Sequence, residues 1–199
     1  MLYFVTGASG SGKTACMAYL GELNGDPKLY DFDDLATGEN LGTAWRQRTT
    51  ERLLKTAIRH QDEGRDTVVC GGAVLGEILA CPSAPEVDGI ALCSLDCSDL
   101  VRVDRLRAQR PHLATQDMLN WAAWLRVHRV DPTWEPRVIR TGEVPEMEWS
   151  RWESWQRGDS RWHSWTLDTS SMTLTQIGNW LTDWINDEQT RITARRNRL

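Results

Sequence analysis

The sequence predicts an α/β protein in which a parallel sheet of about five strands lies between layers of helices. Two observations lead to this prediction. Short apolar runs alternate along the chain with amphipathic stretches, which is the order that parallel strands and crossover helices require. The 199 residues also suffice for one α/β domain with a substantial core but are few for two, and no internal repeat or linker marks a second domain.

The candidate strands are short runs rich in apolar residues that end at turn signals. They occupy residues 2–6, 28–32, 66–70, 89–95 and 162–170. Apolar residues at helical spacing predict helices between these runs, in residues 13–23, 41–60, 98–110, 116–128, 143–158 and 173–185. In the fifth of these helices Pro145 lies near the start and Gly158 at the end, which are the positions that these residue types favour.

The composition excludes several classes of protein. The net charge of −5 argues against a dedicated nucleic-acid-binding protein. No apolar run of about 18 residues is present, so the sequence predicts no transmembrane helix and no membrane partner. The first residues lack the basic start and long apolar stretch of a secretory signal, and the five cysteines form no CxxC pair. Reduced core thiols in a cytoplasmic protein are therefore expected.

The end of the chain is rich in arginine. We interpret residues 189–199 as a solvated basic tail, which leaves residues 1–188 as a single domain.

Residues 7–14 have the sequence GASGSGKT, which matches the phosphate-loop pattern G-x-x-x-x-G-K-[ST]. The stretch follows a predicted strand and opens a predicted helix, as this pattern requires, so a chance glycine-rich turn is the weaker alternative. Lys13 can reach the β- and γ-phosphates of ATP, and the Thr14 hydroxyl can bind Mg²⁺. The sequence thus predicts a three-layer P-loop NTPase-type fold whose ATP site consists of Gly7, Ala8, Ser9, Gly10, Ser11, Gly12, Lys13 and Thr14.

A cluster of carboxylates follows the second predicted strand. Asp31 and Asp33 are two residues apart, so on an extended chain their side chains point the same way. One carboxylate can support Mg²⁺, and the other can accept a proton from an attacking hydroxyl group. The alternative is an ordinary acidic turn in which Asp33 or Asp34 caps the next helix, but the neighbouring phosphate loop favours a site.

These features together resemble the shikimate kinase and gluconate kinase group of small P-loop phosphotransferases. The stretch YDFDD resembles the D-x-D that ends the second strand of shikimate kinases. The resemblance implies that Asp31 supports Mg²⁺ and that Asp33 binds the accepting hydroxyl group. It covers residues 1–113 and, more loosely, the last strand and helix.

The same resemblance implies further substrate contacts. TVVCGGAVL resembles the glycine-rich end of the third strand in this group, which implies that Gly71 and Gly72 pack against the substrate. AWRQRTTERL resembles the segment with the substrate-binding arginine, which implies Arg48, with Arg46 as the competitor. The stretch RAQRPHL resembles the start of the lid in this group, which implies that Arg110 faces the phosphates. The stretch WLRVHRVDPTW implies a further substrate-binding arginine, Arg126.

The segment 111–165 is richer in tryptophan than expected of a shikimate kinase, and the whole chain has 11 tryptophans. We expect a helical lid or substrate-binding insert here. Trp149, Trp152 and Trp155 recur every third residue, which predicts one stripe along a helix. The rings suit a satellite core, and the alternative is that some line a pocket and stack on a flat acceptor.

The sequence therefore predicts an ATP- and Mg²⁺-dependent kinase that phosphorylates a hydroxyl group of a small molecule, with Lys13, Asp33 and Arg110 as catalytic residues. A nucleoside or nucleotide kinase is one alternative, which the tryptophans favour. A non-transferring NTPase or nucleotide switch is another. Against the latter, the third predicted strand ends in Gly71 and Gly72, where a Walker B acid would be expected.

Overall fold

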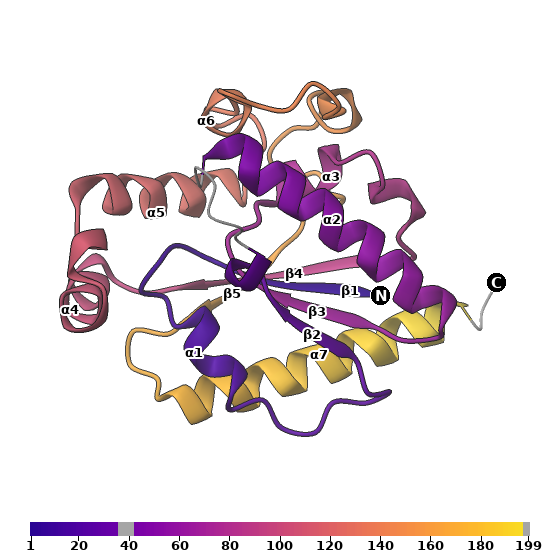
Figure 1. Ribbon diagram of the computed structural model, residues 1–199, viewed down its shortest axis with the longest axis horizontal. Coiled ribbons are helices and arrows are strands. Elements are labelled where there is room, and N and C mark those ends of the chain that lie inside the picture. Colours follow the sequence, from indigo (N-terminus) through magenta and orange to yellow (C-terminus); the bar gives the residue numbers. More distant parts are fainter. Residues whose placement is uncertain (36–41, 197–199) are drawn as a thin grey trace.

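The computed structural model describes residues 1–35 and 42–196, with side chains described up to residue 191 (Figure 1). Its centre is a five-stranded sheet in the order β2-β3-β1-β4-β5, and every neighbouring pair of strands is parallel. The predicted parallel sheet is therefore confirmed. The strands are β1 (Leu2–Thr6), β2 (Lys28–Asp31), β3 (Thr67–Cys70), β4 (Ile90–Asp96) and β5 (Trp165–Asp168).

Helices cover both faces of the sheet, which gives the three predicted layers (Figure 1). On one face lie α1 (Lys13–Met17) and α7 (Leu174–Arg196). On the other lie α2 (Thr43–Asp62), α3 (Leu75–Ala80), α5 (Gln116–His128) and α6 (Arg137–Arg140). Near the carboxyl ends of the strands, α4 (Asp99–Gln109) follows β4.

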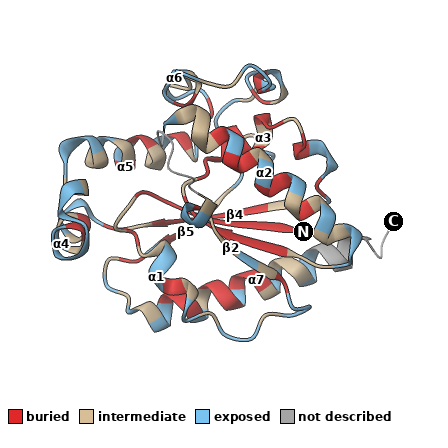
Figure 2. Cartoon of the chain, viewed as in Figure 1, coloured by how far each residue is buried: buried red, intermediate tan, exposed pale blue. Residues whose placement is uncertain are grey.

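The central strand shows why the sheet needs two covered faces. Leu2 and Phe4 belong to the core on the α2 side, whereas Tyr3 and Val5 belong to the core on the α7 side. Because successive side chains of a strand point to opposite faces, a strand that is apolar throughout must be buried on both. Figure 2 accordingly shows the central strands buried along most of their length.

The helix after the phosphate loop is shorter than predicted, since α1 ends at Met17 and the predicted helix extends to residue 23. The chain instead runs along α7, whose side chains supply its hydrogen-bond partners. The backbone N–H of Gly21 donates to Thr182 Oγ1 (2.8 Å), and that of Asn24 donates to Asn186 Oδ1 (3.0 Å). The backbone after α1 packs closely against α7 at Gly178, where a Cβ would lie 2.2 Å from the carbonyl oxygen of Tyr19.

The prediction of a helix over residues 143–158 is wrong. Only a 3₁₀ turn, Trp149–Arg151, forms in this stretch. The segment is hydrogen-bonded to α3 and the residues after it: Glu148 N–H donates to the carbonyl oxygen of Ala80 (2.7 Å), and Trp152 Nε1 donates to that of Gly76 (2.8 Å). These long-range hydrogen bonds hold the segment in place. A continuous helix would instead have formed hydrogen bonds within the segment.

The other elements lie close to the predicted ranges, and α5 matches its predicted range from Gln116 to His128. The helix predicted over residues 41–60 is α2, although Leu41 lies outside the described residues. The last helix continues to Arg196, so it includes much of the segment that we interpret from sequence as a tail. All five cysteines are buried and unpaired. Within residues 1–35 and 42–196, no helix is both long and apolar enough to cross a membrane.

Candidate functional site

The phosphate loop has backbone conformations that require glycine. Gly7, Gly10 and Gly12 have φ angles of 140°, 82° and 97°, which side chains other than glycine rarely adopt. A Cβ on Gly7 would also lie 2.1 Å from the carbonyl oxygen of Leu95 on β4. The glycines of the motif thus allow a tight turn directly beside the neighbouring strand.

Side chains from outside the loop bind its carbonyl oxygens. Arg102 Nη1 donates to the carbonyl oxygen of Ser9 (2.7 Å), and Arg105 Nη1 donates to that of Gly10 (3.3 Å). Thr169 Oγ1, in the turn after β5, donates to the carbonyl oxygen of Ser11 (2.9 Å). With these carbonyl oxygens bound by protein donors, the loop is suited to present N–H groups to an anion.

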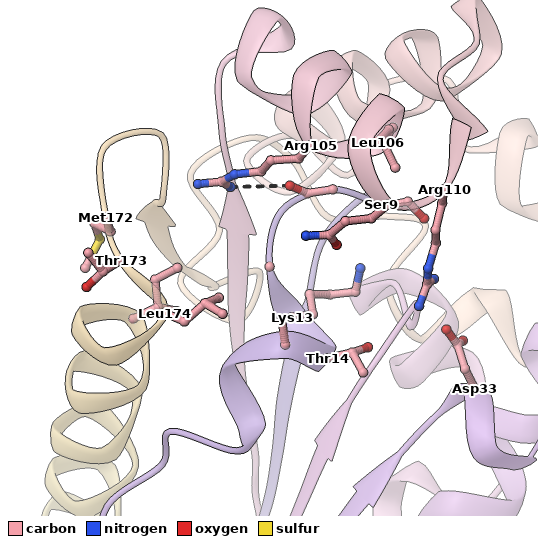
Figure 3. Close-up of a pocket in the computed structure, with 15 residues that line it drawn as sticks. Ser9, Lys13, Thr14, Asp33, Arg105, Leu106, Arg110, Met172, Thr173 and Leu174 are labelled. Atoms are coloured by element: carbon pink, nitrogen blue, oxygen red, sulfur yellow. Dashed lines mark hydrogen bonds between the residues drawn. The ribbon is translucent and has the colours of Figure 1, made fainter. Parts of the chain in front are cut away.

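A cleft of about 450 Å³ lies between the phosphate loop, α4 and the start of α7 (Figure 3). Lys13 and Thr14 line it from the loop side, Arg110 from the end of α4, and Asp33 from the turn after β2. Figure 3 shows the side chains of Arg110 and Asp33 pointing toward one another from opposite sides of this space. The structure therefore brings the three predicted catalytic residues to one cleft.

Lys13 is half-buried, and its Nζ lies 3.3 Å from the carbonyl oxygen of Ala8. Burial lowers the pKa of Lys13, whereas the carboxylates of Asp33 and Asp31 act in the opposite direction. A bound triphosphate would likewise favour the charged ammonium group.

The carboxylates after β2 differ in their positions. Asp31 Oδ1 accepts a hydrogen bond from the backbone N–H of Asp33 (2.9 Å), so Asp31 fixes the turn that carries Asp33. Asp33 lines the cleft, and Asp31 is not among its lining residues. The Thr14 hydroxyl and these carboxylates offer the oxygen ligands that suit Mg²⁺. Within the described residues, no group of three or more acidic, histidine or cysteine side chains could hold a metal by itself.

The two glycines after β3 have different roles. A Cβ on Gly71 would lie 2.0 Å from Cβ of Phe32, so the packing of Phe32 accounts for this glycine. A Cβ on Gly72 would have no described heavy atom within 4 Å. Gly72 alone of the pair therefore borders open space where a substrate could approach.

Arg46, one of the two arginines considered for substrate binding, forms an ion pair inside the protein. Arg46 Nε and Nη2 lie 2.6 Å from the two carboxylate oxygens of the fully buried Glu77. Burial raises the pKa of Glu77, and the guanidinium of Arg46 opposes this rise. The guanidinium also lies over the ring of Trp121, 5.2 Å from its centroid. Arg48 is exposed on α2 and does not line the cleft.

Arg126, which the resemblance implies as a further substrate-binding arginine, also forms ion pairs inside the protein. Its Nε lies 2.7 Å from Asp96 Oδ2, and its Nη2 lies 2.6 Å from Asp99 Oδ1. These hydrogen bonds raise the pKa of Arg126 and lower that of Asp99. The side chain thus joins α5 to β4 and α4.

Four residues that together support the phosphate loop were not predicted from the sequence: Asp96, Arg102, Arg105 and Thr169. A signal for part of this group is present in the sequence, because Arg102 and Arg105 are three residues apart on a predicted helix and must share a face. Asp96 could have been noted as the acid that ends the strand before this helix.

Most tryptophans of the segment 111–165 pack in or against the core on the α2 side of the sheet; Trp134 is exposed, and Trp165 packs against the core on the α7 side. Trp124, Trp149, Trp152 and Trp162 are buried, and no tryptophan is among the residues that line the cleft. His128 lies among these rings, with its own ring stacked on Trp124 at a centroid distance of 4.4 Å. The buried rings belong to the same core cluster as Leu2 and Phe4, so they extend the core on the α2 side of the sheet and do not form a separate satellite core.

No protein-family model matches the sequence, and no curated protein matches it. Solved structures do match. A sugar kinase from a Janibacter species is 14% identical, with 93% of this chain and 94% of that chain covered and a TM-score of 0.54. A gluconokinase from Sinorhizobium meliloti is also 14% identical, with 94% of each chain covered and a TM-score of 0.52.

Shikimate kinase from Acinetobacter baumannii, solved in complex with shikimate, is 16% identical, with 94% of this chain and 93% of that chain covered and a TM-score of 0.52. The protein has an α/β P-loop fold. The predicted resemblance to small-molecule kinases of this group is confirmed at the level of the fold, and the predicted fold class is confirmed with it.

Proposed function

We propose that this protein is a kinase that transfers the γ-phosphoryl group of ATP to a hydroxyl group of a small molecule. The observation that carries the proposal is the convergence of Lys13, Arg110 and Asp33 on the cleft beside the phosphate loop. Two cations and one carboxylate at the carboxyl edge of a parallel sheet suit charge neutralisation and proton removal at a phosphoryl group.

The chemistry is a direct displacement. The acceptor oxygen attacks the γ-phosphorus, the bond from this phosphorus to the β,γ-bridging oxygen breaks, and ADP leaves with the electron pair. Asp33 accepts the proton of the attacking hydroxyl group. Lys13 and Arg110 offset the charge on the transferring phosphoryl group, so catalysis consists mainly of positioning and electrostatic stabilisation.

Thr14 and Asp31 are the residues proposed to hold Mg²⁺, which when bound would supply positive charge that offsets the negative charge of the phosphates. The far end of the cleft, between Gln109 on α4 and the residues Met172 to Leu174, is available to the nucleoside part of ATP. The names of the structural neighbours favour a polyhydroxylated acceptor, which would approach past Gly72. Buried, unpaired cysteines fit the cytoplasm as the proposed location.

The proposal is tested by ADP formation from Mg²⁺·ATP with and without acceptors, in a panel of sugars, sugar acids, cyclitols and nucleosides. We expect ADP formation that depends on one class of acceptor and is lost in Lys13→Met. Lys55→Met is the matched control, because Lys55 is an exposed lysine of α2 that forms an ion pair with Glu51 one helical turn away. ADP formation at an equal rate without any acceptor would instead identify an NTPase.

A further inference from the structure

Asp96 lies at the carboxyl end of β4, the strand that pairs with β1 on the side away from β3. Both of its carboxylate oxygens are bound by arginines from different helices. Oδ1 lies 2.6 Å from Arg102 Nη2 on α4, and Oδ2 lies 2.7 Å from Arg126 Nε on α5. One carboxylate therefore joins three elements of the fold.

Arg102 extends this connection to the phosphate loop. The residue is fully buried, and its Nη1 donates to the carbonyl oxygen of Ser9 at 2.7 Å. A buried guanidinium requires a counter-charge, and Asp96 supplies it. The position of the Ser9 peptide is thus set by a side chain whose own position depends on the carboxylate of Asp96.

A second route runs through the backbone of Asp96. Its carbonyl oxygen accepts a hydrogen bond from the N–H of Thr169 (2.7 Å), and Thr169 Oγ1 donates to the carbonyl oxygen of Ser11 (2.9 Å). Arg105 completes the arrangement, because its guanidinium contacts both Thr169 and the carbonyl oxygen of Gly10. Three successive carbonyl groups of the loop are therefore bound by residues that meet at the end of β4.

We propose that Asp96 is a positioning residue for the phosphate loop, which it reaches through Arg102, and that it ties the loop to α5 through Arg126. This inference rests on the proposed function, in which the loop binds the phosphates of ATP. Displacement of a binding group by about 1 Å can cost on the order of 10²-fold in rate. Loss of the carboxylate should therefore weaken phosphate binding while the nucleoside end of the cleft, which Asp96 does not line, is unaffected.

Two variants and two ligands test the proposal in the full chain. Asp96→Asn removes the charge and leaves Arg102 buried without a counter-charge. Asp96→Glu keeps the charge and the fold but moves the carboxylate by one methylene group. The ligands are the imido analogue of ATP with Mg²⁺, measured by calorimetry, and adenosine, measured by ligand-observed NMR, which registers weak binding.

We expect the ATP analogue to bind about 10- to 100-fold more weakly to both variants and adenosine to bind as to the wild type. Asp99→Asn is the matched control, because it removes a partner of Arg126 but none of Arg102, and it should bind both ligands normally. Unchanged binding of the analogue to Asp96→Asn and Asp96→Glu would overturn the proposal. An equal loss of both ligands would also overturn it, because Asp96 would then support only the general fold. Failure of the wild type to bind the analogue would contradict the proposed function itself.

Discussion

The phosphate-loop edge of the sheet and the tryptophan-rich segment (residues 111–165) hold their side chains in opposite ways. At the edge, Lys13, Asp33 and Arg110 border a cleft of about 450 Å³ and face solvent or a ligand. In the tryptophan-rich segment, most of the large side chains are buried in the core. Trp152, for example, is 2% exposed, and its Nε1 donates to the carbonyl oxygen of Gly76. In this protein, charged side chains exposed in a cleft form the proposed reaction site, whereas the unusually abundant tryptophans mainly build the core.

Removal of the loop lysine should have the largest effect at the phosphate-loop edge. Lys13→Met should retain the fold but lower phosphoryl transfer on the order of 10³-fold, because an apolar side chain cannot neutralise the transferring phosphoryl group. Initial rates under saturating ATP, with the melting temperature recorded in parallel, measure this effect. Normal turnover by pure Lys13→Met protein would show that the loop does not have the proposed role in phosphoryl transfer.

The carboxylates after β2 should have separable effects on the reaction at this edge. Asp33→Asn should lower kcat by about 10²-fold, because the amide cannot accept the proton of the acceptor. Asp31→Asn should mainly raise the Mg²⁺ concentration needed for half-maximal activity. Asp34→Asn is the control, since Asp34 is exposed and does not line the cleft. If all three variants transfer phosphate normally, the cluster is only an acidic turn.

Substitutions of buried tryptophans in the tryptophan-rich segment should lower stability, whereas those at the phosphate-loop edge should lower activity. Trp152→Ala removes a buried ring at the centre of an aromatic cluster and should lower the free energy of unfolding by about 3–5 kcal/mol. Trp134→Ala, at a ring that is 46% exposed, should change it by less than about 0.5 kcal/mol. Urea unfolding measures both. An altered KM for the acceptor in Trp152→Ala, with unfolding unchanged, would mean that this ring lines a binding site.

His128 adds a further effect on stability, which depends on pH. Burial lowers the pKa of His128 to about 4, below its ordinary value of 6.5. The unfolded chain therefore binds a proton more readily than the folded chain between these pH values, and the free energy of unfolding should fall by about 3 kcal/mol as pH falls from 6.5 to 4. His128→Phe keeps a ring against Trp124 but cannot titrate. Identical pH profiles for wild type and variant would refute this contribution.

The sequence predicts the structure of the phosphate-loop edge better than that of the tryptophan-rich segment, and the reason is physical. Gly7 to Thr14 form their site through backbone conformations that a few adjacent residues determine, and β2 delivers Asp33 to the same edge. The role of Arg46 depends on Glu77, a residue on another helix whose carboxylate captures the guanidinium. No local pattern reveals such a pairing.

The same reason explains the incorrect helix over residues 143–158. The spacing of Trp149 and Trp152 fits a helical stripe, but both rings pack against distant parts of the chain, and the backbone is hydrogen-bonded to the residues around Ala80. Tertiary contacts here override local propensity. Asp96 and Arg102 were missed because a buried ion pair between a strand end and a helix depends on how the two elements dock.

The most direct test of the central claim follows the γ-phosphate itself. Phosphorus NMR of the wild type with Mg²⁺·ATP and an accepted substrate shows whether the phosphate ends in an ester or in solution. We expect one phosphate ester for each ADP formed, no inorganic phosphate above background, and neither product in Lys13→Met. Inorganic phosphate formed at the same rate with or without the acceptor would contradict it, because the cleft would then serve hydrolysis rather than transfer.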